Sequence, residues 1–116
     1  MLLGLQTEII QEIARLVENK WDIISVNVEI DKVAGDLVTS PDAVFVQKKL
    51  FKKKIEQFRL NIDVVDLLKK LRNSMAGDEP EKKAWKICQI EIQSSGKYNF
   101  SFSYDEPPRL AALKRA

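Results

Sequence analysis

The sequence lacks histidine altogether, and it has a single cysteine, Cys88, among its 116 residues. The absence of histidine excludes Ser–His and Cys–His nucleophilic catalysis and histidine-ligated zinc, and it removes the usual general base near neutral pH. One cysteine cannot form an internal disulfide or a cysteine-based metal cluster. The four glycines, Gly4, Gly35, Gly77 and Gly96, are too scattered for a phosphate-cradling loop. We therefore expect a protein that is not an enzyme and has no cofactor and no metal site.

Long apolar runs are also missing, since no stretch approaches the roughly 18 residues that a membrane span needs. The first residues, MLLGLQTEII, meet glutamine and glutamate too early for a secretory signal. Hydrophobic residues make up 45% and charged residues 31% of the chain, as in an ordinary globular protein. We expect one domain over residues 1–116, in the cytoplasm, with no membrane partner and no small-molecule substrate.

Hydrophobic spacing predicts two amphipathic helices, at residues 5–19 and 62–76. Asn61 is a suitable N-cap for the second helix, and Gly77 suits its C-terminal end. Alternation of apolar and polar residues predicts a half-buried antiparallel strand at 22–31. Residues 32–42 are interpreted as a turn region with a short strand at 37–39.

The segment 43–58 fits a helical period, but its β-branched and aromatic residues favour two strands, at 43–49 and around 51–58. Pro108 suits the first turn of a short last helix. The predicted fold class is α+β: an antiparallel sheet with an N-terminal helix and a central helix packed on one face, and a C-terminal β-hairpin.

The register of the C-terminal hairpin follows from its pattern. A two-residue loop would pair Ile92 with Asn99, which sets an apolar residue against a polar one. A three-residue loop over 94–96 instead pairs Ile92 with Tyr98, Ile90 with Phe100 and Cys88 with Phe102. Paired residues share a face of the sheet, so the second register is the consistent one. It places Cys88 on the core face as an inert thiol.

The opposite face of this hairpin carries hydrogen-bonding side chains, which suit either a protein interface or plain solvent exposure. If it is an interface, we expect the contact residues to be Gln89, Glu91, Lys97 and Asn99, joined by Glu29 and Asp31 if the strands lie in one sheet. Trp21 and Trp85 could each anchor a partner or close an end of the core.

Five lysines occupy the seven residues Lys48–Lys54. They could bind phosphates, with Phe45, Phe51 and Phe58 as stacking platforms, so an alternative function is a small nucleic-acid-binding module. Charge runs are more often solvated edges whose aromatics face the core. We therefore do not expect direct nucleic-acid binding.

The stretch WKICQIEIQSSGKYNFSFSYD, at residues 85–105, resembles the C-terminal hairpin of the YezG-like immunity protein family. In that family a tryptophan opens a strand, a Ser/Thr-Gly-Lys-aromatic-Asn turn follows, and an aromatic-alternating strand ends in Tyr-Asp or Tyr-Glu. The matching positions here are Trp85, Ser95, Gly96, Lys97, Tyr98, Asn99, Phe100, Phe102, Tyr104 and Asp105. The order of elements before it is also similar.

The resemblance implies an immunity protein, or antitoxin, which binds and neutralises a cognate bacterial toxin domain, often a nuclease, by stoichiometric occlusion. Inhibitors of nucleases are often acidic, whereas this chain has a net charge of +2. Three explanations stay open: the acidic residues are localised, the lysine run meets an acidic toxin surface, or the chain binds away from the toxin's active site. The toxin's identity and the oligomeric state do not follow from the sequence.

Overall fold

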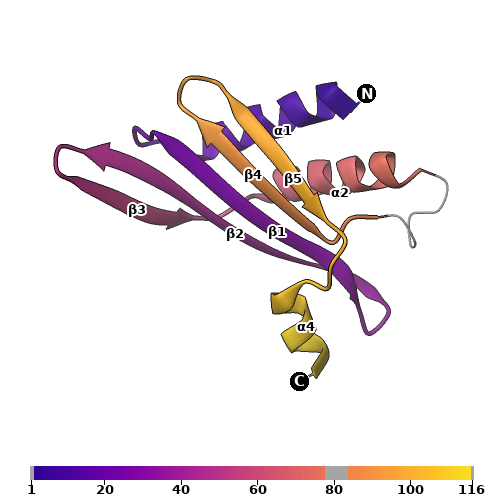
Figure 1. The fold of residues 1–116 in the computed structure, drawn as a ribbon. Helices are drawn as coiled ribbons and strands as arrows, with labels where there is room; N and C mark the ends of the chain where they lie inside the picture. The colour runs from indigo at the N-terminus through magenta and orange to yellow at the C-terminus, as the bar shows by residue number, and fades with distance from the viewer. Residues whose placement is uncertain (1, 78–83, 116) are drawn as a thin grey trace.

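A computed structural model describes residues 2–77 and 84–115, and the side chains of residues 4–77 and 84–115. Within these ranges, three helices and five strands form an α+β fold, as predicted. Figure 1 shows their arrangement in space. The helices are α1 (Leu2–Leu16), α2 (Ile62–Ala76) and α4 (Pro108–Arg115), and the strands are β1 (Ile23–Val33), β2 (Asp36–Lys49), β3 (Lys52–Phe58), β4 (Ile87–Gln93) and β5 (Tyr98–Ser103).

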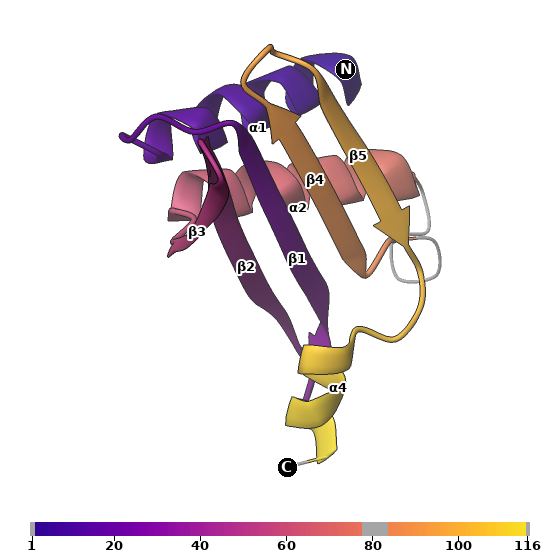
Figure 2. The same ribbon diagram turned by 60° about the vertical axis from the view of Figure 1, so that its left-hand side comes forward.

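The strands form one antiparallel sheet in the order β3-β2-β1-β4-β5. β1, β2 and β3 are joined in sequence as hairpins. The segment that contains α2 then connects β3, at one edge of the sheet, to β4, which pairs with the other side of β1. Figures 1 and 2 show α1 and α2 side by side on one face of the sheet, with α4 against the other face near the end of β1. The predicted packing of two helices on one face is therefore confirmed.

The core lies between the sheet and the helices α1 and α2. Along β1, alternate residues from Ile24 to Ile30 are at most 3% exposed, and they pack in one cluster with apolar side chains of both helices. Ile9 and Ile13 of α1 and Leu68 of α2 are fully buried in this cluster. The helical and strand periods thus bring apolar faces together, and burial of these side chains is the main stabilising contribution.

The ends of the helices follow local chemistry. α2 spans the predicted residues, with the Asn61 side chain accepting a hydrogen bond from the Val64 amide at 3.0 Å. α1 is shifted relative to the predicted range 5–19, because it begins at Leu2 and ends at Leu16. The chain must leave the helix there to enter the sheet: the Asp22 amide donates to the Val46 carbonyl at 2.8 Å, and the Asp22 carbonyl accepts from Ser94 at 2.9 Å.

The interpretation of residues 32–42 as a turn region is wrong. The turn consists of Ala34 and Gly35, with φ of 52° and 88°, and β2 then runs from Asp36 through Pro41 to Lys49. Positive φ at both positions is what a two-residue hairpin turn of type I′ requires. Pro41 is tolerated because β3 pairs with β2 only from Ala43 onward, so proline lies where that ladder has ended.

We predict that Ala34→Asn raises the free energy of unfolding by about 1 kcal/mol, because asparagine adopts positive φ more readily than alanine does. Ala34→Val is expected to lower it, since a β-branched side chain is strained at this φ. Urea denaturation of the variants measures both effects. An asparagine variant no more stable than the wild type would contradict this account of the turn.

Candidate functional site

The C-terminal hairpin has the predicted register. Ile92 pairs with Tyr98, Ile90 with Phe100 and Cys88 with Phe102. The loop covers residues 94–96: the Gln93 amide donates to the Lys97 carbonyl at 2.8 Å, and Gly96 has φ of 99°. This register turns the polar side chains of β4 and β5 to the face opposite α1 and α2.

Two cross-strand rows of side chains continue this polar surface over β1 and β2. One row consists of Val44, Ser25, Glu91 and Asn99, and the next of Asp42, Asn27, Gln89 and Ser101. We call these eight residues, of which all but Val44 are polar, the polar face. Together they line a shallow hollow of about 330 Å³. The side chains on β4 and β5 are exposed and those of β1 are half-buried, so the face offers donors and acceptors to a binding partner.

The structure brings three of the predicted contact residues together, because Gln89, Glu91 and Asn99 all line the hollow. Lys97 is exposed just outside it, where the turn leads into β5. The sequence reasoning expected the first strand to contribute through Glu29 and Asp31, and it missed Ser25 and Asn27 of that strand and all of β2. Ser25 and Asn27 alternate with core residues, which was a usable signal for the face they lie on, but the pairing of β1 with β4 was not deducible from local pattern.

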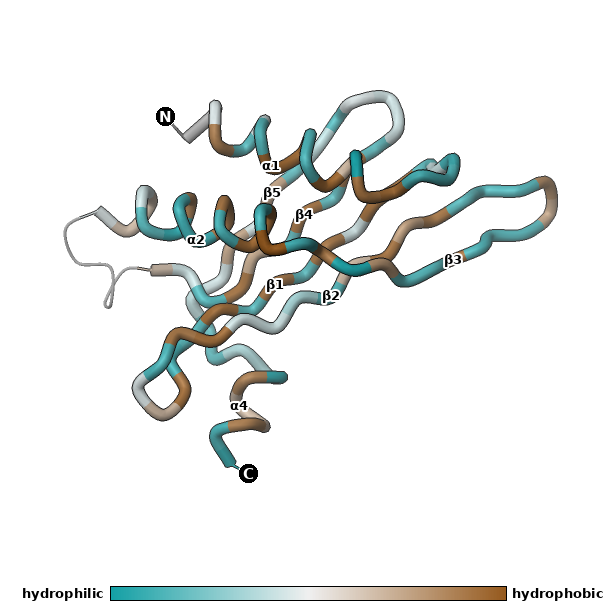
Figure 3. Tube along the Cα trace, turned by 180° about the vertical axis from the view of Figure 1, so that it is seen from behind, coloured by the Kyte–Doolittle hydropathy of each residue, from teal (hydrophilic) through white to brown (hydrophobic). Residues whose placement is uncertain are grey.

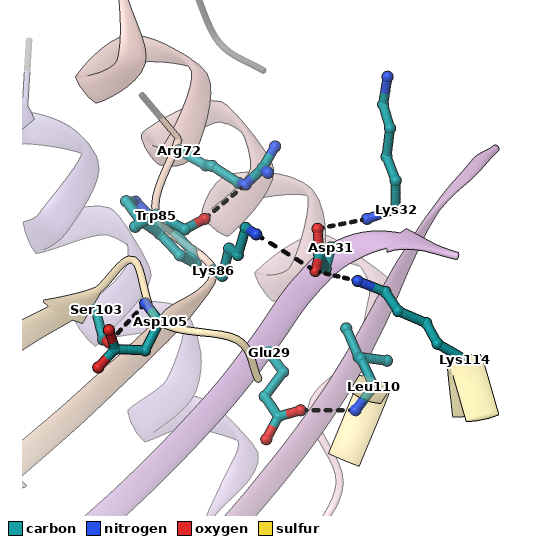
Figure 4. Close-up of polar contacts among 10 residues, drawn as sticks. All are labelled: Glu29, Asp31, Lys32, Arg72, Trp85, Lys86, Ser103, Asp105, Leu110 and Lys114. Atoms are coloured by element: carbon teal, nitrogen blue, oxygen red, sulfur yellow. Dashed lines mark hydrogen bonds and ion pairs between the residues drawn. The ribbon is translucent and has the colours of Figure 1, made fainter. Parts of the chain in front are cut away.

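Glu29 and Asp31 require a correction as contact residues. Their strand does lie in the same sheet, but both residues contact α4 and are only 1% and 7% exposed. Glu29 Oε1 accepts a hydrogen bond from the Leu110 amide at 3.0 Å (Figure 4). Its Oε2 lies 3.2 Å from Arg109 Nη1. These carboxylates therefore hold the last helix in place and are not open to a partner.

Asp31 is the second anchor of α4. Its Oδ2 lies 2.7 Å from Lys114 Nζ and 3.8 Å from Lys86 Nζ, and its Oδ1 accepts from the Lys32 amide at 2.8 Å (Figure 4). Burial by itself would raise the pKa of this carboxyl. The hydrogen bonds and the two lysine charges outweigh burial and lower the pKa below its usual 3.8.

Arg109 links this anchor to the hollow. Its Nη2 donates to Asn27 Oδ1 at 3.0 Å and to the Ser40 carbonyl at 2.6 Å, and its Nε donates to Ser40 Oγ at 2.9 Å. Asn27 lines the hollow, so these hydrogen bonds from Arg109 fix the orientation of an amide side chain in the wall of the hollow. The start of α4 thus borders the polar face at one end.

Burial of Cys88, Trp85 and Trp21 indicates which of these residues belong to the core. Cys88 is fully buried, and burial raises the pKa of its thiol to about 12, which leaves it inert near neutral pH. Trp85 is also fully buried and packs against Phe102, with 5.5 Å between ring centroids, so it belongs to the core. Its carbonyl accepts from Arg72 Nε at 2.8 Å. Trp21 is half-buried against the core cluster.

Comparison with models of known protein families found no match to this chain, and comparison with curated proteins found none either. Among the described residues, no group of three or more histidine, cysteine, aspartate or glutamate side chains is arranged to hold a metal ion. None of the helices in this part of the chain is long and apolar enough to cross a membrane.

We predict that Arg109→Ala lowers the free energy of unfolding by about 2 kcal/mol. The change leaves the Glu29 carboxylate buried without its cation, and the full cost of an unpaired buried charge is reduced here because the Arg109 side chain is 38% exposed. Arg115→Ala, at the exposed end of α4, is the matched control and should change stability little. Equal effects of the two substitutions in chemical denaturation would contradict the anchoring role.

The lowered pKa of Asp31 predicts a pH-dependent contribution to stability. A carboxylate with a depressed folded-state pKa stabilises above its unfolded-state value, which is near 4, and this contribution is lost as pH falls through the folded-state pKa. Asp31→Asn should therefore be less stable than the wild type at neutral pH, and the difference should shrink below about pH 4. Denaturation curves between neutral pH and about pH 3 test this. A difference that stays constant over that range would argue against it.

Proposed function

We propose that this chain is an immunity protein that binds a cognate bacterial toxin domain and blocks it by stoichiometric occlusion. The observation that carries the proposal is the polar face, in which exposed hydrogen-bonding side chains from neighbouring strands surround a hollow. Half of that face belongs to the hairpin whose sequence resembles the YezG-like family. Occlusion of this kind requires no catalytic residue in the inhibitor.

The charges of the polar face support a nuclease as the toxin. Asp42 and Glu91 place two carboxylates among amide and hydroxyl groups in the lining of the hollow. A nuclease binds phosphates with basic side chains, so its substrate groove is electrostatically complementary to such a surface. Of the three explanations for a net charge of +2, this arrangement favours localised acidic residues.

The expected contact is larger than the hollow. A stable protein complex buries about 800 Å² on each partner, which is more surface than a shallow hollow presents. We therefore expect the contact to extend from the polar face over β5 and onto the turn at residues 94–97. The side chains of this turn are exposed. Polar groups buried in such a contact give specificity, because an unmatched partner leaves them unsatisfied.

Co-expression tests the proposal. The toxin candidate is the C-terminal domain of a large protein encoded beside this gene, because an immunity gene is expected next to its toxin gene. We expect the chain to restore growth and to be isolated in a one-to-one complex. Glu91→Lys should weaken that complex about a hundredfold, since it reverses a charge inside the contact. Affinity is measured by calorimetry on purified proteins.

Glu8→Lys is the matched control, because Glu8 is an exposed carboxylate on α1, across the sheet from the polar face. It should leave the affinity unchanged. A complex that tolerates Glu91→Lys as well as Glu8→Lys would place the interface elsewhere. A toxic domain with neither rescue nor complex would overturn the immunity proposal.

A further inference from the structure

The hairpin of β2 and β3 extends past the rest of the sheet. The pairing of β2 with β1 ends at Val46, opposite Ile23, whereas its pairing with β3 continues to Lys49 and Lys52. We call residues 47–54 the lysine ribbon. Figure 1 shows it projecting from one corner of the sheet, away from α4.

The tip of the lysine ribbon is apolar and exposed. Leu50 is 83% exposed and Phe51 is 97% exposed, and Phe51 has φ of 74°, which bulky residues rarely adopt. In Figure 3 the tip is a hydrophobic spot between two hydrophilic strands. Single exposed apolar residues are common on protein surfaces, whereas adjacent ones that are rimmed by polar residues mark a contact surface.

The lysines surround this tip on both faces of the ribbon. Lys49 lies directly opposite Lys52, and Lys48 directly opposite Lys53. Like charges in opposed positions repel each other, so this arrangement is unfavourable without an anionic partner. Successive residues of a strand point to opposite faces, so one pair lies on each face. All four side chains are exposed.

We propose that the lysine ribbon docks on an anionic lipid surface. Leu50 and Phe51 enter the boundary between headgroups and acyl chains, and the lysine pairs contact the anionic headgroups around them. Peripheral proteins bind such surfaces by inserting apolar side chains into the lipid interface while nearby cations contact the anionic headgroups. The proposal revises the expectation of no membrane partner, and it does not depend on the immunity function.

A nucleic acid is the competing anionic partner, and the placement of the aromatic residues argues against it. Binding of single strands relies on successive stacking platforms. Phe45 is 5% exposed and packs against Phe58, with 6.2 Å between ring centroids, so neither ring is presented as a platform beside Phe51. Leu50 offers no stacking surface, but its apolar area is removed from water in a lipid interface.

Vesicle co-sedimentation of the full chain tests the proposal. We expect binding to phosphatidylcholine vesicles containing about 30% phosphatidylglycerol, at least about tenfold weaker binding to phosphatidylcholine alone, and weakening by salt. The double variant Leu50→Ser/Phe51→Ser and the double variant Lys48→Gln/Lys53→Gln should each bind about tenfold more weakly. All four positions are exposed, so folding should be retained, which circular dichroism verifies.

Ile62→Ser and Lys70→Gln are the matched controls. Both residues are exposed on α2. Ile62 follows the end of β3 that is farthest from the ribbon tip. They should bind the anionic vesicles as the wild type does. No binding of the wild type, or binding that both serine substitutions leave intact, would overturn the proposal. Tighter binding to labelled RNA or duplex DNA than to the vesicles, lost in the lysine variant, would overturn it in favour of nucleic acid.

Discussion

The separation of apolar and polar side chains along the central strand β1 is the constraint on which the rest of the structure depends. Residues from Ile24 to Ile30 on one face must be covered, and α1 and α2 cover them. The alternate residues of β1 are polar and need partners of another kind. Ser25 faces the open hollow, Glu29 and Asp31 are satisfied through α4, and Asn27 both lines the hollow and accepts from Arg109 of α4. One strand pattern thus sets both the core and the site.

Glu29 decides where the polar face ends. A carboxylate that is 1% exposed is tolerated because a backbone amide and a guanidinium satisfy it, and both come from α4. Such a pair adds little net stability compared with an apolar contact, but it has few alternative arrangements, so it positions the helix specifically. Because Arg109 also bonds Asn27, the same contact orders one side of the hollow.

The sequence predicted what is local. Periodicity defined α2, and the β-branched and aromatic residues of 43–58 favoured its two strands. Cross-strand consistency and the position of Gly96 selected the three-residue loop before Lys97. Two features were out of reach. The turn at Ala34 has alanine where glycine or asparagine is usual, so it was not recognised and the start of β2 was missed. The burial of Glu29 and Asp31 depends on α4, which docks about 80 residues later in the chain.

A net charge near balance hides two surfaces of opposite character. The carboxylates Asp42 and Glu91 line the polar face, while the lysine ribbon carries its cations past the end of the sheet. Along β2, Lys48 lies six positions after Asp42, which is about 20 Å of extended chain. That separation exceeds the Debye length at physiological salt, so the two surfaces attract their partners nearly independently. The charge of one surface therefore has little effect on the affinity of the other for its partner, and each proposal is tested by its own measurement.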